Sequence, residues 1–165
     1  MRKISLILTS FLLSCSVCHN TQDYKASCLL IPTQEYVMMY KTMNETIPFD
    51  SIINDSIKES YVVIGIHKIS SNMAFVKTEN TLGTIEHKGW VDKRFLGIFL
   101  SQPNIFLYDQ PKHNSRVCDS IRGVFWGDWV PIIDCKNKWI YTSKNGHEGW
   151  IAPQDQCDNP YSSCN

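Results

Sequence analysis

A glycine-tryptophan pair that occurs twice, 60 residues apart, constrains the fold more than any other feature of the sequence. Gly89-Trp90-Val91 and Gly149-Trp150-Ile151 each follow a run rich in aromatic or β-branched residues. A glycine at such a place lets another backbone pass where a Cβ would collide, and the indole covers one end of a small core. Two such triplets in one short chain predict two copies of one small β unit.

The segments around the two triplets predict strands in the same order. Runs typical of strands occupy residues 36–40, 61–66, 73–77 and 95–99 in the first copy and 105–109, 117–121, 129–134 and 138–142 in the second. Asn145-Gly146 indicates a two-residue hairpin. No stretch shows a helical period over ten or more residues. The sequence therefore predicts an all-β chain with units over residues 35–99 and 103–156, each suited to a five-stranded, partly open barrel.

The charge balance excludes some partners. The chain has 16 basic and 16 acidic side chains and a formal net charge of zero, so it carries no electrostatic footprint for nucleic acid or for an anionic membrane surface. It contains no nucleophile motif, phosphate loop or dinucleotide fingerprint, and its histidines lack metal-ligand spacing. We expect no cofactor, no metal and no catalytic activity.

The N-terminus predicts export. Arg2 and Lys3 precede an apolar run, residues 4–13, that is too short to span a bilayer. Leu12-Leu13-Ser14-Cys15 resembles the bacterial lipobox, which implies a lipoprotein signal peptide over residues 1–14 and acylation of Cys15. Residues 15–34 then hold the lipidated cysteine and a flexible tether, with Cys28 opening the structured part. In the alternative, an ordinary secretory leader is cut elsewhere and Cys15 is incidental.

Export also affects the cysteines, of which there are seven. If Cys15 carries lipid, six remain, and an oxidising compartment permits up to three disulfides. Fifteen connectivities are open. Local pairing of Cys118 with Cys135 and of Cys157 with Cys164 would fasten the second unit and the tail, residues 157–165.

The second unit resembles the bacterial SH3-like (SH3b) domain. The resemblance is carried by Leu107-Tyr108, Gly127-Asp128-Trp129-Val130, Trp139-Ile140-Tyr141 and Gly149-Trp150-Ile151. The first unit fits with a longer loop and with Ala74-Phe75-Val76 where Trp139-Ile140-Tyr141 stands later. Both units lack the family's Arg-x-Gly-Pro after the first strand. The resemblance implies two tandem SH3-like barrels, non-catalytic, that bind cell-wall glycopeptide or other proteins in a groove between loops.

Three aromatic residues are the candidate ligand contacts. By the same resemblance, Tyr40 and Tyr108 occupy a place that often lines the groove; alternatively they cap each barrel. Trp126 lies in a predicted turn and is the candidate for an exposed stacking residue, or else packs on the other unit. Trp129, in the strand pattern, is expected in the core.

Two weaker patterns remain. Cys118 or Cys135 with His113 or His147 would make a thiol pair for catalysis, but we expect both thiols in disulfides. Asp-Ser-Ile at residues 50–52, 55–57 and 119–121 resembles a short sequon for O-glycosylation of exported bacterial proteins.

The sequence thus predicts a non-catalytic envelope lipoprotein, facing the periplasm or on the outer membrane, that touches the membrane only through its lipid. Its SH3-like modules are expected to bind peptidoglycan or its stem peptides. The alternative is a protein-binding lipoprotein, such as an inhibitor or immunity protein against a secreted cell-wall hydrolase. A small envelope enzyme is the third hypothesis and needs a free reactive thiol.

Overall fold

The computed structural model describes residues 27–54, 62–78, 87–122 and 128–157. Within these ranges the chain contains β-strands and two single 3-10 turns, η1 (Lys93–Phe95) and η2 (Pro153–Asp155), and no α-helix. The prediction of an all-β chain is confirmed. No helix of the described residues is long and apolar enough to cross a membrane.

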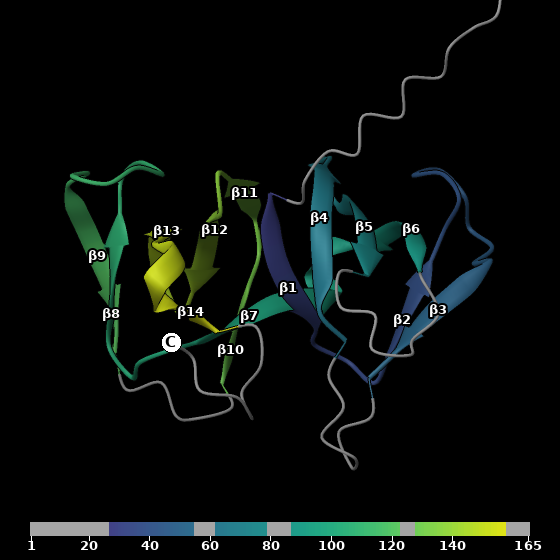
Figure 1. Ribbon diagram of the computed structural model, residues 1–165, viewed down its shortest axis with the longest axis horizontal. Helices are drawn as coiled ribbons and strands as arrows, with labels where there is room; N and C mark the ends of the chain where they lie inside the picture. The colour runs from purple at the N-terminus through teal and green to yellow at the C-terminus, as the bar shows by residue number, and fades with distance from the viewer. Residues whose placement is uncertain (1–26, 55–61, 79–86, 123–127, 158–165) are drawn as a thin grey trace, which may run out of the picture.

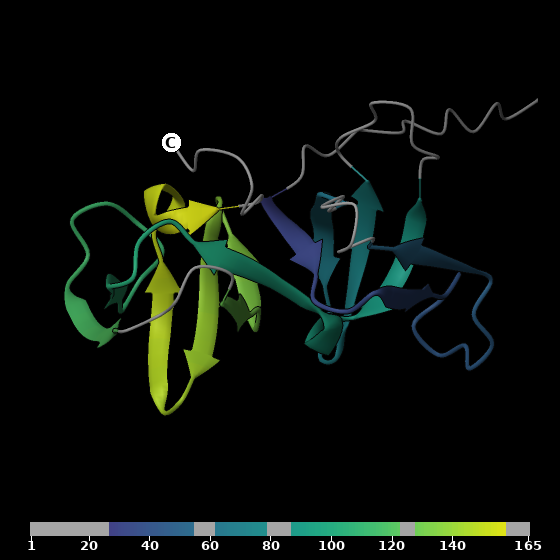
Figure 2. The ribbon, with the colours of Figure 1, turned by 90° about the horizontal axis from the view of Figure 1, so that it is seen from below.

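The strands fall into two groups joined by β7 (Figures 1 and 2). The N-terminal group is β1 (Cys28–Pro32), β2 (Tyr36–Met39), β3 (Asp50–Ile53), β4 (Ile64–Ile69), β5 (Met73–Thr78) and β6 (Lys88–Asp92). The C-terminal group is β8 (Ile105–Tyr108), β9 (Val117–Ile121), β10 (Trp129–Pro131), β11 (Asp134–Lys136), β12 (Trp139–Lys144), β13 (His147–Ile151) and β14 (Gln156–Cys157). Between them lies β7 (Leu96–Leu100).

Hydrogen bonding arranges these strands in three sheets. One has the order β10-β7-β1-β4-β5-β6, with β14 also paired to β7. The second has the order β11-β12-β13-β8-β9, and β2 with β3 forms a two-stranded ribbon. A bridge between Tyr40 and Trp90 connects this ribbon to β6. The first sheet therefore contains strands of both groups.

The burial of each strand follows from its neighbours. Along β5, Ala74, Val76 and Thr78 are buried while the residues between them are half-exposed, as expected for a strand with one covered face. Every residue of β7 is buried. A continuous apolar run such as Leu-Gly-Ile-Phe-Leu is typical of a strand covered on both faces. This burial marks β7 as the central element of the fold.

β7 pairs with strands of both groups. Gly97 lies opposite Ile31 of β1 and opposite Pro131 of β10, and Phe99 lies opposite Cys157 of β14. A Cβ at Gly97 would lie 2.7 Å from the Val130 carbonyl oxygen and 2.8 Å from Trp129 Cε3. Real Cβ atoms do not approach that closely, so only glycine allows β10 to pair here. The boundary predicted between residues 99 and 103 lies just beyond β7.

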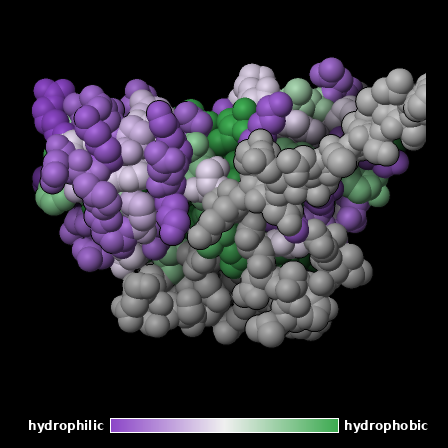
Figure 3. All heavy atoms as spheres, turned by 45° about the horizontal axis from the view of Figure 1, so that its top comes forward, coloured by the Kyte–Doolittle hydropathy of each residue, from purple (hydrophilic) through white to green (hydrophobic). Residues whose placement is uncertain are grey.

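The core is likewise continuous between the groups. One cluster of buried apolar side chains contains Leu30 and Ile64 from the N-terminal group together with Leu107 and Ile140 from the C-terminal group. The surface differs between the groups: in Figure 3 it is largely hydrophilic over the C-terminal group, whereas hydrophobic atoms gather where the groups adjoin.

A disulfide also links the groups. Cys28 of β1 is bonded to Cys135 of β11, with their Cα atoms 6.2 Å apart. The predicted pairing of Cys118 with Cys135 is wrong, because Cys135 is bonded to Cys28. Cys118 is a free, exposed thiol. Cys157 is disulfide-bonded, to a partner outside the described residues; Cys15 and Cys164 also lie outside them.

Two tight hairpins shape the five-stranded sheet. Asn145 and Gly146 have φ of 55° and 84° and connect β12 to β13, as predicted. A second hairpin, which was not predicted, connects β11 to β12 through Asn137 and Lys138, with φ of 51° and 71°. The Lys138 amide donates to the Ser27 carbonyl at 2.8 Å. The positive φ of a lysine is thus held by contact with the start of β1.

Removing the disulfide with Cys28→Ser and Cys135→Ser should lower the free energy of unfolding by about 2–5 kcal/mol, because the bond closes a long loop in the unfolded chain. Urea unfolding followed by tryptophan fluorescence measures the change. Cys118→Ser is the matched control and should leave the midpoint unchanged. An unshifted midpoint in the double variant would show that the bond does not stabilise the fold.

Candidate functional site

The two Gly-Trp strands have equivalent neighbours. On β6, Trp90 lies between Phe75 of β5 and Tyr40. On β13, Trp150 lies between Tyr141 of β12 and Tyr108 of β8. Residues directly opposite one another point to the same face of a sheet. Each group therefore carries a row of three aromatic side chains, the N-terminal row (Phe75, Trp90, Tyr40) and the C-terminal row (Tyr141, Trp150, Tyr108).

This register corrects one predicted correspondence between the two units of the chain. Phe75 corresponds to Tyr141, because each lies opposite the tryptophan of its row. Ala74-Phe75-Val76 therefore corresponds to Ile140-Tyr141-Thr142 and not, as predicted, to the triplet that begins one residue earlier. Trp139 has its equivalent in Met73.

The glycine of each pair has the steric role that its position suggested. A Cβ on Gly89 would lie 3.1 Å from the Tyr40 carbonyl oxygen, and one on Gly149 would lie 3.2 Å from the Tyr108 carbonyl oxygen and 2.9 Å from Leu107 Cβ. Glycine lets the ribbon β2–β3, or the pair β8–β9, approach the Gly-Trp strand. Tyr40 and Tyr108 are held at the end of each row by this approach.

The N-terminal row is flanked by cations. The rings of Phe75 and Trp90 lie 5.4 Å apart at 59°. Lys68 Nζ lies 5.9 Å from the Trp90 ring centroid, and Lys88 Nζ lies 5.8 Å from that of Phe75. Ammonium groups over aromatic faces are attracted by the ring quadrupole. Tyr40, at the far end of the row, is half-buried.

The C-terminal row is more polar and packs differently. The Tyr141 and Trp150 rings lie 5.2 Å apart, and the Tyr141 hydroxyl donates to Glu148 Oε1 at 2.7 Å. That hydrogen bond, with partial burial and the charge of Glu148, raises the pKa of Tyr141. Tyr108 meets the buried Trp139 edge-on at 5.4 Å. Tyr108 thus covers Trp139 and remains half-exposed itself.

A histidine-aspartate pair lies next to each aromatic row. One pair involves the β2–β3 ribbon and the other involves the β8–β9 pair. His87 Nδ1 lies 2.9 Å from Asp50 Oδ2, and His147 Nδ1 lies 3.0 Å from Asp119 Oδ1. The pKa of Asp119 is lowered most by the hydrogen bond with His147 and next by the hydrogen bond from the Ser120 amide. Burial acts to raise the pKa of Asp50, but hydrogen bonds from His87 and the adjacent amide hold it below its usual value. Both aspartates belong to Asp-Ser-Ile triplets, so the pairing gives these triplets a structural role.

Trp126 lies outside the described residues, whereas Trp129 is placed differently from the prediction. Trp129 is 37% exposed and is not a core residue. Val130 is fully buried, and alternation along β10 directs its neighbour outward. An inward Val130 indicates an outward Trp129, whereas the prediction of a core Trp129 treats residues 129–134 as one continuous buried strand.

Trp129 lines a groove of about 430 Å³. We call this the Trp129 groove; its other lining residues are Asp128, Pro131, Ser143, Lys144 and Asn145. Lys144 Nζ donates to the Trp129 carbonyl at 2.7 Å, which fixes its ammonium group at the backbone of β10. The groove thus combines an aromatic face with a carboxylate, an ammonium, an amide and a hydroxyl. Such a mixture can hold a polar ligand with an apolar face.

Of the two thiols considered for catalysis, only Cys135 is in a disulfide; the expectation of a disulfide at Cys118 is wrong. Cys135 is in the disulfide, and Cys118 Sγ lies near the carbonyl oxygens of Leu107 and Glu148, at 3.5 and 3.8 Å. His113 packs on Trp139, and His147 pairs with Asp119. In the described ranges, no three His, Cys, Asp or Glu side chains are grouped so that they could hold a metal ion.

Comparison with known proteins identifies no relative: no family model matches the chain, and a search of curated proteins finds no match. The resemblance to SH3-like domains stays a prediction from the sequence motifs.

The His147–Asp119 pair predicts a contribution to acid stability. Because the folded-state pKa of Asp119 is lowered, the stability it adds is present above about pH 4 and is lost as pH falls through that lowered pKa. Asp119→Asn should lower stability at neutral pH and flatten its decline below pH 4, as measured by urea unfolding at a series of pH values. Asp134→Asn, at an exposed aspartate of the same sheet, is the control. Parallel pH profiles for Asp119→Asn and the wild type would contradict the assignment.

Proposed function

We propose that this chain is a non-catalytic envelope protein whose strand groups act as two SH3-like modules and bind peptidoglycan or its stem peptides. The observation that carries the proposal is the Trp129 groove. An exposed indole offers an apolar face on which a sugar ring can stack, and the polar groups around it can bond hydroxyl and amide groups. A glycan strand with attached peptides presents both kinds of surface.

Duplication is supported by the succession of elements. In each group a Gly-Trp strand is followed by a single 3-10 turn and then by a strand that pairs at the junction: β6, η1 and β7, and later β13, η2 and β14. The aromatic rows and the histidine-aspartate pairs repeat in the same positions. We propose that Tyr40 and Tyr108, at the ends of these rows, and Trp126 add further ligand contacts.

The disulfide indicates an oxidising compartment, in agreement with an exported protein. We propose that Cys15 is acylated and anchors the protein in the membrane. Metabolic labelling with an alkyne fatty acid should label the wild type, and Cys15→Ser should abolish that label. Cys118→Ser is the control and should keep it. Label that persists in Cys15→Ser would rule out this anchor.

Retention on purified sacculi tests the binding proposal. Trp129→Ala should weaken retention on the order of ten-fold or more, because exposed aromatic residues often dominate binding energy. Trp126→Ala should also weaken it. Tyr36→Ala is the matched control, since it removes an exposed aromatic side chain far along the chain from the groove. A wild type that sacculi do not retain, with unaltered folding, would refute the proposal.

A second function, binding of another envelope protein, is favoured by the outer face of the β2–β3 ribbon. Tyr36, Met38 and Ile53 are exposed there, with Tyr36 directly opposite Ile53. Exposed apolar clusters often mark protein interfaces. An inhibitor or immunity protein would use such a face. Failure of sacculi to retain the chain would favour this second function.

A further inference from the structure

The β2–β3 ribbon and the β8–β9 pair have the same register. In the first, Val37 lies opposite Ile52; in the second, Ile105 lies opposite Ile121. These four side chains are buried. The inward faces therefore pack on the core in the same way in both groups. Each outward face has four corresponding positions.

The outward faces differ in chemistry. In the N-terminal group the four positions hold apolar side chains and one hydroxyl: Tyr36, Met38, Ser51 and Ile53. In the C-terminal group they hold Asn104, Phe106, Ser120 and Arg122. Because packing is supplied by the other face, it does not dictate this choice. The two outward faces therefore differ in surface chemistry and not in packing.

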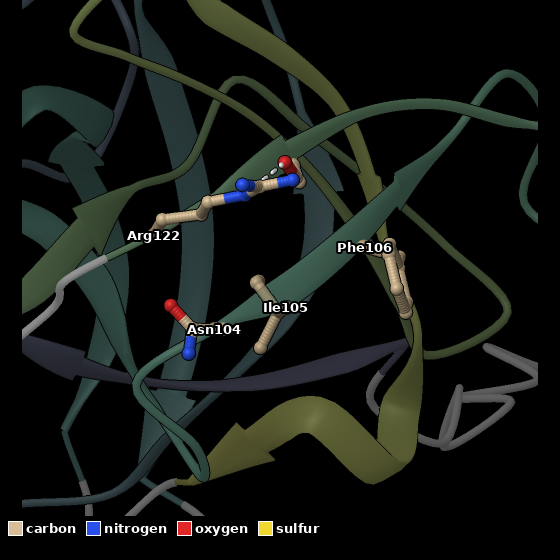
Figure 4. A pocket seen from close by; sticks show the side chains of 5 residues that line it. Asn104, Ile105, Phe106 and Arg122 are labelled. Carbon is tan, nitrogen blue, oxygen red and sulfur yellow. Dashed lines mark hydrogen bonds between the residues drawn. The ribbon is translucent and has the colours of Figure 1, made fainter.

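The C-terminal face is hollowed into a groove of about 270 Å³, which we call the Arg122 groove (Figure 4). Phe106 is 58% exposed and stands along β8, with Asn104 and Arg122 toward the other end. Arg122 Nε donates to Ser120 Oγ at 3.3 Å, which orients the guanidinium across the groove. The bond uses Nε and does not involve the two terminal nitrogens.

The carboxylates of β9 and of the turn after β8 have other partners. Asp119 pairs with His147, and Asp109 accepts a hydrogen bond from Ser115 and pairs with Arg116. Among the ion pairs of the described residues, none involves Arg122. The groove therefore holds a guanidinium and an exposed aromatic ring, and among the described residues the guanidinium has no ion-pair partner.

We infer that the Arg122 groove binds the terminal carboxylate of a peptide that ends in a small aliphatic residue. A planar guanidinium matches a carboxylate through two parallel N–H···O bonds, and Phe106 offers an apolar surface to the aliphatic side chain. The inference rests on the proposed function, in which the stem peptides of peptidoglycan are the ligand. It assigns their free end to this groove and leaves the sugar to the Trp129 groove.

The test is titration of the full chain with diacetyl-L-lysyl-D-alanyl-D-alanine and with its C-terminal amide, followed by NMR. The acid should bind and the amide should bind about ten-fold or more weakly, because the amide loses a charge-assisted pair. Arg122→Gln should abolish the difference between acid and amide, while Arg122→Lys keeps only part of it. Phe106→Ala should weaken both peptides. Met38→Ala, the matched position in the N-terminal group, should change neither.

The outcomes separate this inference from the proposed function. Equal binding of acid and amide, absence of peptide binding, or an Arg122→Gln variant with wild-type preference would overturn the carboxylate site. If sacculus retention is nevertheless lost in Trp129→Ala, the proposed function stands without it. If the acid is preferred but sacculi are not retained, the groove is confirmed and the cell-wall function fails.

Discussion

The structure depends on the close approach of three backbones at Gly97. The strand that contains it pairs with β1 on one edge and β10 on the other, and the missing Cβ permits the pairing with β10. Besides this approach, the two strand groups are linked by the Cys28–Cys135 disulfide, by the hydrogen bond from the Lys138 amide to the Ser27 carbonyl and by a shared apolar core. The Trp129 groove is built in part on β10, a strand of the sheet that also contains β1 and β4, whereas the Arg122 groove lies on the five-stranded sheet of the C-terminal group.

Much of the fold was predictable because its signals are local. The repeated Gly-Trp triplets, the β-branched runs and Asn145-Gly146 each specify conformation within a few residues. β3 was missed, since Asp50–Ile53 lies in a polar stretch and becomes a strand through the pairing of Ile52 with Val37. The Cys28–Cys135 bond was also missed, because its partners are 107 residues apart and only the arrangement of the sheets brings them together.

The candidate site was predicted in part, for similar reasons. The correspondence of Tyr40 with Tyr108 follows from the repeat, and both lie opposite the tryptophan of their row. Their packing does not follow from it, because Tyr108 rests on Trp139 through a contact that spans three strands. Trp129 and Arg122 stand out only when register shows which face each strand turns outward. Sequence alone identifies the residue types, whereas pairing decides their exposure.

The bond between Cys28 and Cys135 makes a covalent ring of most of the described chain, and the ring contains both grooves' principal residues, Trp129 and Arg122. A single break of the backbone anywhere within that ring, for example between β7 and β8, leaves the two fragments attached to each other. Where proteases cut exposed connections, a nicked molecule would keep both grooves joined to its N-terminal segment. The linkage thus holds the grooves to the rest of the chain even when the main chain between Cys28 and Cys135 is cut once.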